Sequence, residues 1–280
     1  MPIIDSQVHA YAADTPDNPW KMKRNWPPSV TGDEMVRAMD EVGVDGAILV
    51  SAFSIYGYDA TFAVAARNDH PGKFGLVKPI DLTNPGLAED IDAWKATPGT
   101  VGIRLLPYYG DGVDVGSPAV KAALDAARRH DFPTNLLLWG ALDAGIEMID
   151  RFPDNRFVID HLGLEQPRTP PAPDAPWADL PRILDLATRP NAVIKISGAC
   201  TLSKTGYPYD DIWDPLARIF DAWGIDRCLW GTDWTRTHEI LSYDQGVEPF
   251  RLTDRLSESD RAMLMGGACA KAYGWSPSQS

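Results

Sequence analysis

Eight short apolar runs, each followed by a loop and a helix-like segment, constrain the fold of this chain more than any other feature. The runs are rich in Val, Ile and Leu and cover residues 3–8, 46–51, 74–79, 101–106, 134–138, 157–160, 193–197 and 228–232. The helix-like segments between them cover residues 33–42, 60–68, 86–94, 119–130, 141–151, 178–186 and 209–223. Strands that alternate with helices predict a parallel sheet. Eight units in 280 residues predict an α/β fold with one domain over residues 1–280, a (β/α)8 TIM barrel of the usual length of about 250 residues.

An open, doubly wound sheet is the alternative, but no glycine-rich phosphate loop follows the first run. The loop lengths support the barrel. The turns that follow helices are short, whereas five loops that follow strands are long: 10–32, 107–118, 162–177, 199–208 and 234–248. In a barrel the functional face is the carboxyl end of the strands, where these long loops would lie.

Composition limits the partners. The formal net charge of −13 argues against binding to nucleic acid or to an anionic membrane, although a pocket can still be locally basic for an anionic small molecule. No run of about 18 apolar residues predicts a membrane span, and no export signal is recognisable at the start. Three scattered cysteines without a CxxC spacing indicate reduced thiols and a cytoplasmic location. The sequence leaves a homo-oligomer open.

Polar residues gather at the carboxyl ends of the predicted strands. They are Gln7, His9, Lys78, Asp81, Arg104, Asp160, His161, Lys195, Ser197 and Asp233. A barrel would bring them into one bowl. Residues two apart on a strand share a face, so Asp5, Gln7 and His9 are expected to point the same way.

The residue types suggest attack of water on an electrophilic carbon of an anionic substrate. Asp233 can act as a general base or as a metal ligand. His9 and His161 can donate to a carbonyl oxygen or bind a divalent ion. Arg104 can clamp a carboxylate, with Arg236 or Lys78 as further cations.

Each residue also has a structural interpretation. His161 can be a hydrogen-bonded packing residue, Asp233 can bind a backbone turn, and Arg104 can pair with a barrel carboxylate. Lys195, between two isoleucines, is expected to be an ion-pair partner, because a buried lysine must be paired or neutral. The aromatic residues of the long loops, among them Tyr108 and Trp139, can either line a ring-binding pocket or cover the core.

Five motifs in order resemble the amidohydrolase superfamily, in particular the amidohydrolase-2 group that contains 2-pyrone-4,6-dicarboxylate lactonases and sugar-acid and muconolactone-type lactonases. They are Asp5-Ser6-Gln7-Val8-His9, Gly102-Ile103-Arg104, Asp160-His161-Leu162-Gly163, Lys195-Ile196-Ser197-Gly198 and Gly231-Thr232-Asp233-Trp234. The resemblance implies a distorted barrel in which Asp233 activates water and His161 polarises the substrate carbonyl. It also implies that His9 is the second histidine of a His-x-His pair and that Arg104 binds a substrate carboxylate.

Gln7 departs from this pattern, since it stands where the family usually has the first histidine. Glutamine is a poor zinc ligand, and the resemblance implies that lactonase relatives work without a required metal. Gln7 can instead donate its amide N–H to a lactone carbonyl. The fourth and fifth strands carry Arg104 and Asn135, so no lysine stands there that could be carboxylated to bridge two metal ions. A binuclear metal centre is therefore not expected. Lactonase relatives often carry an arginine near the position of Thr201. This chain has none there, so a second substrate carboxylate would have to bind Lys204 or Arg236.

The sequence therefore predicts a hydrolase that opens a small anionic lactone in carbohydrate or aromatic catabolism. Asp233, His161 and His9 would be catalytic, and Gln7, Arg104, Arg236, Lys78 and Tyr108 would bind substrate, with no cofactor required. The alternative is a metal-dependent non-oxidative decarboxylase or hydratase, in which His9, His161 and Asp233 hold one zinc or manganese ion. A binding protein on a barrel that has lost its chemistry is a third interpretation.

Overall fold

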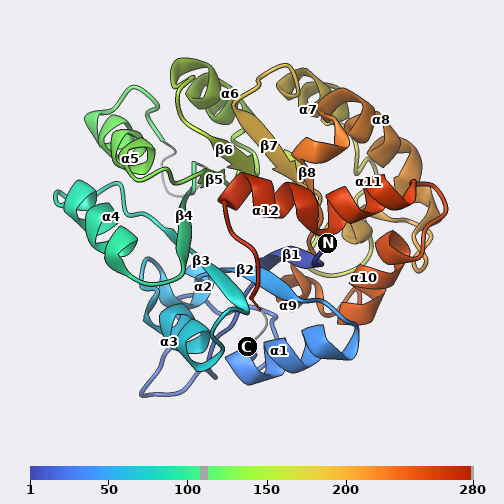
Figure 1. The fold of residues 1–280 in the computed structure, drawn as a ribbon, viewed down its shortest axis with the longest axis horizontal. Coiled ribbons are helices and arrows are strands. Elements are labelled where there is room, and N and C mark those ends of the chain that lie inside the picture. The colour runs from blue at the N-terminus through green and yellow to red at the C-terminus, as the bar shows by residue number, and fades with distance from the viewer. Residues whose placement is uncertain (108–112, 279–280) are drawn as a thin grey trace.

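The computed structural model describes residues 1–107 and 113–278, in which eight parallel strands form one sheet in sequence order (Figure 1). The strands are β1 (Ile4–Val8), β2 (Gly46–Val50), β3 (Phe74–Pro79), β4 (Thr100–Leu105), β5 (Thr134–Leu136), β6 (Phe157–Ile159), β7 (Ala192–Lys195) and β8 (Cys228–Leu229). Ser6 N–H donates to the Trp230 carbonyl at 3.1 Å and Asp233 N–H to the Gln7 carbonyl at 3.0 Å, which joins the last strand to the first. The predicted barrel is confirmed, and each predicted run overlaps one strand.

The helices surround the barrel. They are α1 (Gly32–Glu41), α2 (Phe53–Tyr56), α3 (Thr61–Asp69), α4 (Leu87–Ala96), α5 (Pro118–Arg129), α6 (Leu142–Arg151), α7 (Leu180–Leu186), α8 (Trp213–Trp223), α9 (Trp234–Thr237), α10 (Tyr243–Arg251), α11 (Glu258–Ala262) and α12 (Ala268–Tyr273). Local signals set several starts: Thr31 and Glu34 form a capping box on α1, and Ser117 caps α5 before a proline. The predicted segment 209–223 becomes helical only at Trp213, because Tyr209 has a φ of 64° and a 3-10 turn follows it.

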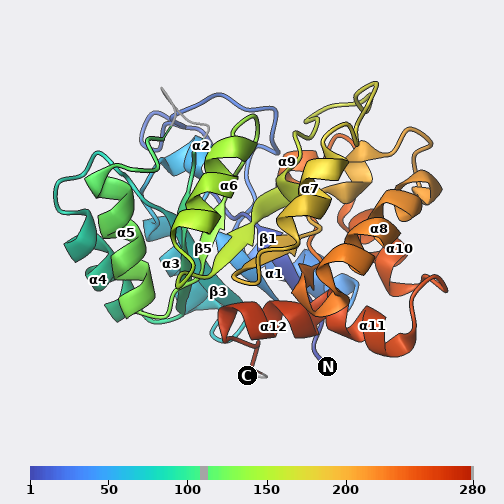
Figure 2. The same ribbon diagram turned by 90° about the horizontal axis from the view of Figure 1, so that it is seen from above.

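The two ends of the barrel are closed differently. At the amino end, Cys269 and Tyr273 of α12 pack with Ile4, Val77 and Leu229 inside the barrel. Figure 2 shows α12 and the N-terminus on one side and long loops on the other. The carboxyl end is thus left for polar side chains, as the loop lengths predict.

One expectation for β1 is wrong. Asp5 pairs in register with Ala47 and Val8 with Leu49, so three steps on β1 match two on β2. This bulge changes the face of the strand. Asp5 points away from the barrel interior and accepts hydrogen bonds from Thr232 N at 2.9 Å and Tyr243 Oη at 3.2 Å. Burial raises the pKa of Asp5 to about 6, although these hydrogen bonds act to lower it.

All three cysteines are free thiols in the interior. Within residues 1–107 and 113–278, no helix combines the length and the apolar character that a membrane span needs.

Candidate active site

Six of the eight predicted site residues meet at the carboxyl ends of the strands. They are Gln7, His9, Arg104, His161, Asp233 and Arg236. Each of them is buried, with at most 4% of its surface exposed. Because they come from β1, β4 and the segments after β6 and β8, only the closed barrel brings them together.

The other two predicted residues are not part of this group. The Lys78 ammonium binds Asp90 of α4 at 2.7 Å and lies 5.3 Å from the centre of the Trp94 ring. Its neighbour Val77 faces the barrel interior, so Lys78 points outward. This placement contradicts the predicted substrate contact of Lys78. Tyr108 lies outside the described residues.

The backbone is strained where two of the polar side chains enter the site. His161 has a φ of 53°, Leu162 a φ of 62° and Asp233 a φ of 53°. Non-glycine residues in this left-handed region cost of order 1–3 kcal/mol each and persist where the surroundings impose them. Here Gln166 Nε2 donates to the His161 carbonyl at 3.2 Å, and Asp233 N–H donates to Gln7. Strain of this kind is typical of functional sites.

Asp233 lies at the centre of the group. Its Oδ2 accepts a hydrogen bond from Arg236 Nε, and His161 Nδ1 lies 3.6 Å from the same oxygen. Its Oδ1 lies 3.4 Å from His9 Nε2 and has no hydrogen-bond partner among the described residues. Burial would raise the pKa of Asp233, but its polar neighbours, above all the Arg236 guanidinium, outweigh burial and hold that pKa far below its usual value. Asp233 is therefore an ionised carboxylate with one oxygen free to accept a proton.

His161 is neutral near pH 7. Burial lowers its pKa to about 3, against the attraction of Asp233 and Asp160. Its Nε2 lies 3.5 Å from Arg104 Nη2, a group that only donates, and its Nδ1 lies 3.0 Å from Ser197 Oγ. The proton therefore lies on Nδ1.

Buried ion pairs around Asp160 hold the residues of the site in place. Asp160 accepts hydrogen bonds from Arg104 Nε at 2.7 Å and Asn135 Nδ2 at 3.3 Å, and its Oδ1 lies 3.1 Å from Lys195 Nζ. Asp160 and Lys195 are completely buried. Burial would raise the pKa of Asp160, but Lys195 and Arg104 hold it below its usual value. The expected ion-pair role of Lys195 is confirmed.

Lys195 also fixes the orientation of the Gln7 amide. Its Nζ donates to Gln7 Oε1 at 2.7 Å, so the amide nitrogen of Gln7 must face His9, whose Nε2 lies 3.3 Å away. His9 Nδ1 lies 2.7 Å from the Val50 carbonyl, which only accepts. These contacts place a proton on His9 Nδ1 and leave Nε2 to accept, rather than to donate as the sequence suggests.

These residues do not fit a divalent metal ion. Three buried cations (Lys195, Arg104 and Arg236) already outnumber the two carboxylates of the group, and a further double charge would be repelled at low dielectric. Arg236 also occupies one oxygen of Asp233. Within the described part of the chain, no three His, Cys, Asp or Glu residues are placed to hold a metal.

Sequence reasoning missed Gln166, and it left open whether Trp139 lines the pocket or covers the core. Gln166 accepts from Arg236 Nη2 at 2.6 Å and donates to the Ser197 carbonyl at 3.1 Å. The centre of the Trp139 ring lies 5.2 Å from Arg236 Cζ, which stacks over it, and 5.6 Å from the centre of the His161 ring. Trp139 follows β5 and Gln166 follows β6, in loops that match no sequence motif. The only sequence signal for a role in the site is that each lies after the carboxyl end of a strand.

A small cavity opens onto four residues of this group, His9, Arg104, His161 and Arg236, whereas Gln7 and Asp233 lie behind its lining. Its volume is about 40 Å³, close to the roughly 30 Å³ that one water occupies in the liquid. Guanidinium groups and aromatic rings line it, together with the two histidines: Arg104, Arg168, Arg236, Trp26, Trp139, His9 and His161. The lining suits an anion, but the loops must open before a larger molecule enters.

Several known proteins resemble this chain along most of its length. A family model described as amidohydrolase matches residues 4–275. A 4-sulfomuconolactone hydrolase of Hydrogenophaga intermedia is 26% identical over 82% of this chain and 73% of that protein. An L-fucono-1,5-lactonase of Burkholderia multivorans is 27% identical over 96% of this chain and 95% of its own length. The crystal structure of a zinc-bound amidohydrolase from B. multivorans has a TM-score of 0.80 and 24% identity, covering 98% of this chain and 100% of that one.

Proposed function

This chain belongs to the amidohydrolase family, and from that premise we propose that it is a lactonase, which hydrolyses a small anionic cyclic ester. One observation carries the proposal: Asp233 Oδ1, buried at the end of β8 beside His9, is an ionised acceptor without a partner among the described residues. Two curated relatives along most of the chain open lactones. The substrate class is therefore a lactone of carbohydrate or aromatic catabolism.

The reaction needs one proton acceptor and one nucleophile. Asp233 Oδ1 accepts a proton from water, and the water oxygen attacks the lactone carbonyl. When the ring C–O bond breaks, the same proton passes to the departing ring oxygen. Lactone and water become a hydroxycarboxylate and one released proton, so no cofactor enters the balance.

Gln7 supplies the donor for the carbonyl oxygen. One amide hydrogen faces His9, and the other is left for the oxyanion that develops in the transition state. Lys195 on the amide oxygen pulls electron density away from the N–H groups and strengthens them as donors. A positioned donor of this kind contributes roughly 10²–10³ in rate.

The acidic group of the substrate binds the arginines of the small cavity. Arg104 Nε is held by Asp160, which leaves its terminal nitrogens on the cavity side. Guanidinium groups match carboxylate and sulfonate oxygens. We place the reaction in the cytoplasm, on the support of the three free cysteines.

The test is a panel of lactones assayed by acid release with a pH indicator. Lactones with a carboxylate or sulfonate are expected to turn over faster than neutral lactones of the same ring size. Chelator treatment should leave the rate unchanged, since the donor set does not fit a metal. Activity that disappears with chelator and returns with zinc or manganese would favour the metal-dependent decarboxylase or hydratase instead. A panel without turnover would contradict the lactonase.

A further inference from the structure

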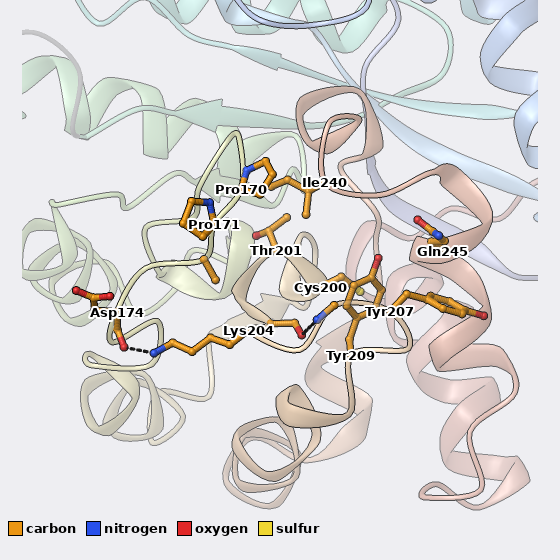
Figure 3. Close-up of a pocket in the computed structure, with 13 residues that line it drawn as sticks. Pro170, Pro171, Asp174, Cys200, Thr201, Lys204, Tyr207, Tyr209, Ile240 and Gln245 are labelled. Carbon is orange, nitrogen blue, oxygen red and sulfur yellow. Dashed lines mark hydrogen bonds between the residues drawn. The ribbon is translucent and has the colours of Figure 1, made fainter.

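A second, larger cavity lies on the same face of the barrel as the catalytic group. Its volume is about 650 Å³, within the range of roughly 300–1,000 Å³ of small-molecule sites. Figure 3 shows it between the proline-rich segment after β6, the loop after β7 and the start of α10. These side chains belong neither to the catalytic group nor to the five family motifs; among them only Lys204 is a candidate replacement for the arginine that lactonase relatives often carry near Thr201.

Tyr209 places a buried polar group in the wall of this cavity. The residue is 2% exposed, and its hydroxyl has no hydrogen-bond partner among the described residues. In Figure 3 its ring stands among the lining residues, with its hydroxyl end toward the space between Ile240 and Gln245. A buried hydroxyl without a partner is costly, so a ligand oxygen would complete it. Tyr207 differs, since its hydroxyl donates to Glu248 at 3.1 Å.

Lys204 supplies a cation to the same space. Its ammonium donates to the Asp174 carbonyl, and it forms no ion pair with another described residue. The loop that carries it is fixed by Asp211, which accepts from Lys204 N at 2.7 Å and Thr205 Oγ1 at 3.0 Å. The cavity therefore has an exposed cation at one side and a buried hydroxyl in its wall.

A thin partition separates this cavity from the catalytic group. Thr201, in the cavity wall, donates from Oγ1 to the Gly198 carbonyl at 2.7 Å. A Cβ at Gly198 would lie 2.7 Å from Arg236 Nη2 and 2.1 Å from Gln166 Oε1. The larger cavity is therefore a neighbour of the Asp233 site and is separate from it.

We propose that this cavity binds a small hydroxycarboxylate anion. The Lys204 ammonium takes the carboxylate, and the Tyr209 hydroxyl pairs with a ligand hydroxyl. The apolar faces of Pro171 and Ile240 contact the carbon chain. The site is inferred from its own side chains; only the idea that its ligand resembles the reaction product rests on the proposed function.

The probe is sodium D-gluconate, titrated calorimetrically into the purified protein, with sorbitol and acetate as probes for the hydroxyls and the carboxylate alone. Gluconate should bind more tightly than either. Tyr209→Phe should weaken gluconate binding about 3- to 10-fold, the loss of one hydrogen bond. The matched control Tyr207→Phe, whose hydroxyl has its own partner, should change it less than about twofold.

A second pair tests the cation. Lys204→Met should weaken gluconate about tenfold, whereas Lys121→Met, on the surface of α5 beside Asp125, should not. Tyr209→Phe should unfold at the same temperature as the wild type or higher, because it removes an unpartnered hydroxyl. Undetectable gluconate binding, or equal effects of Tyr209→Phe and Tyr207→Phe, would overturn the proposal. The titration needs no turnover, so it stands apart from the lactonase test.

Discussion

Two buried aspartates at the mouth of the barrel, Asp160 after β6 and Asp233 after β8, differ in one respect. Both are fully buried and both pair with an arginine. Asp160 has a partner on each oxygen, with Arg104 on Oδ2 and Lys195 and Asn135 near Oδ1. Asp233 has Arg236 on Oδ2 and, among residues 1–107 and 113–278, no hydrogen-bond partner on Oδ1.

This difference gives Asp160 a structural role and Asp233 a catalytic one. A buried carboxylate whose oxygens are all paired holds its neighbours in place and has no capacity left for a proton. A carboxylate kept ionised by one arginine, with its second oxygen bare, can take a proton from water. Charge and burial alone would rank the two residues equally, so the hydrogen-bond inventory decides.

Asp233→Asn should have the largest effect. It removes the proton acceptor, so kcat should fall by about 10²–10⁴-fold, while the KM for an anionic lactone changes little because the arginines remain. Lactone hydrolysis followed with a pH indicator measures both. Asp125→Asn, on the surface of α5, is the control and should keep full activity. Near-normal turnover of Asp233→Asn would remove Asp233 from the mechanism.

Asp160→Asn should act mainly on stability. It leaves the buried charges of Lys195 and Arg104 without their counter-ion, and breaking a buried pair in this way costs about 3–5 kcal/mol. Chemical denaturation measures the loss in the free energy of unfolding. Asp233→Asn should lose less, since Arg236 keeps Gln166 and the Pro167 carbonyl as acceptors. Equal losses in the two variants would break the comparison.

Arg236→Met should change the pH dependence of kcat. Asp233 must be ionised to act, so activity is lost as the pH falls through its pKa. In the wild type this pKa lies far below its usual value of 3.8, so Asp233 should stay active at mildly acidic pH. Without Arg236, the pKa should rise by about 1–3 units, and the acid limb of the pH profile should move upward.

The control for this profile is Arg182→Met, which removes an exposed guanidinium from Asp143. Its acid limb should coincide with that of the wild type. An acid limb that stays in place in Arg236→Met would mean that Arg236 does not govern the ionisation of Asp233.

The sequence predicted the barrel well, because eight alternating segments carry a periodic signal that local physics enforces. It also predicted which strand ends meet, since barrel closure decides that. It failed for Asp5, because the bulge in β1 is set by pairing with β2 and leaves no mark in the residue pattern. The roles of Gln166 and Trp139 and the tautomer of His9 depend on contacts between segments that are distant in the sequence. No local residue pattern encodes such contacts.

The smallest effect is expected for Lys78, which the sequence grouped with Arg104. Lys78→Met should leave the KM for an anionic lactone within about twofold and cost at most about 1 kcal/mol of unfolding free energy, as for exposed ion pairs, because Asp90 is 38% exposed. Arg104→Lys keeps the charge but loses the planar fork, and should raise that KM about tenfold or more. The two residues lie on adjacent strands one register step apart, with Lys78 opposite Ile103 and Pro79 opposite Arg104. Equal changes of KM would therefore mean that the strand face does not decide which cation meets the substrate.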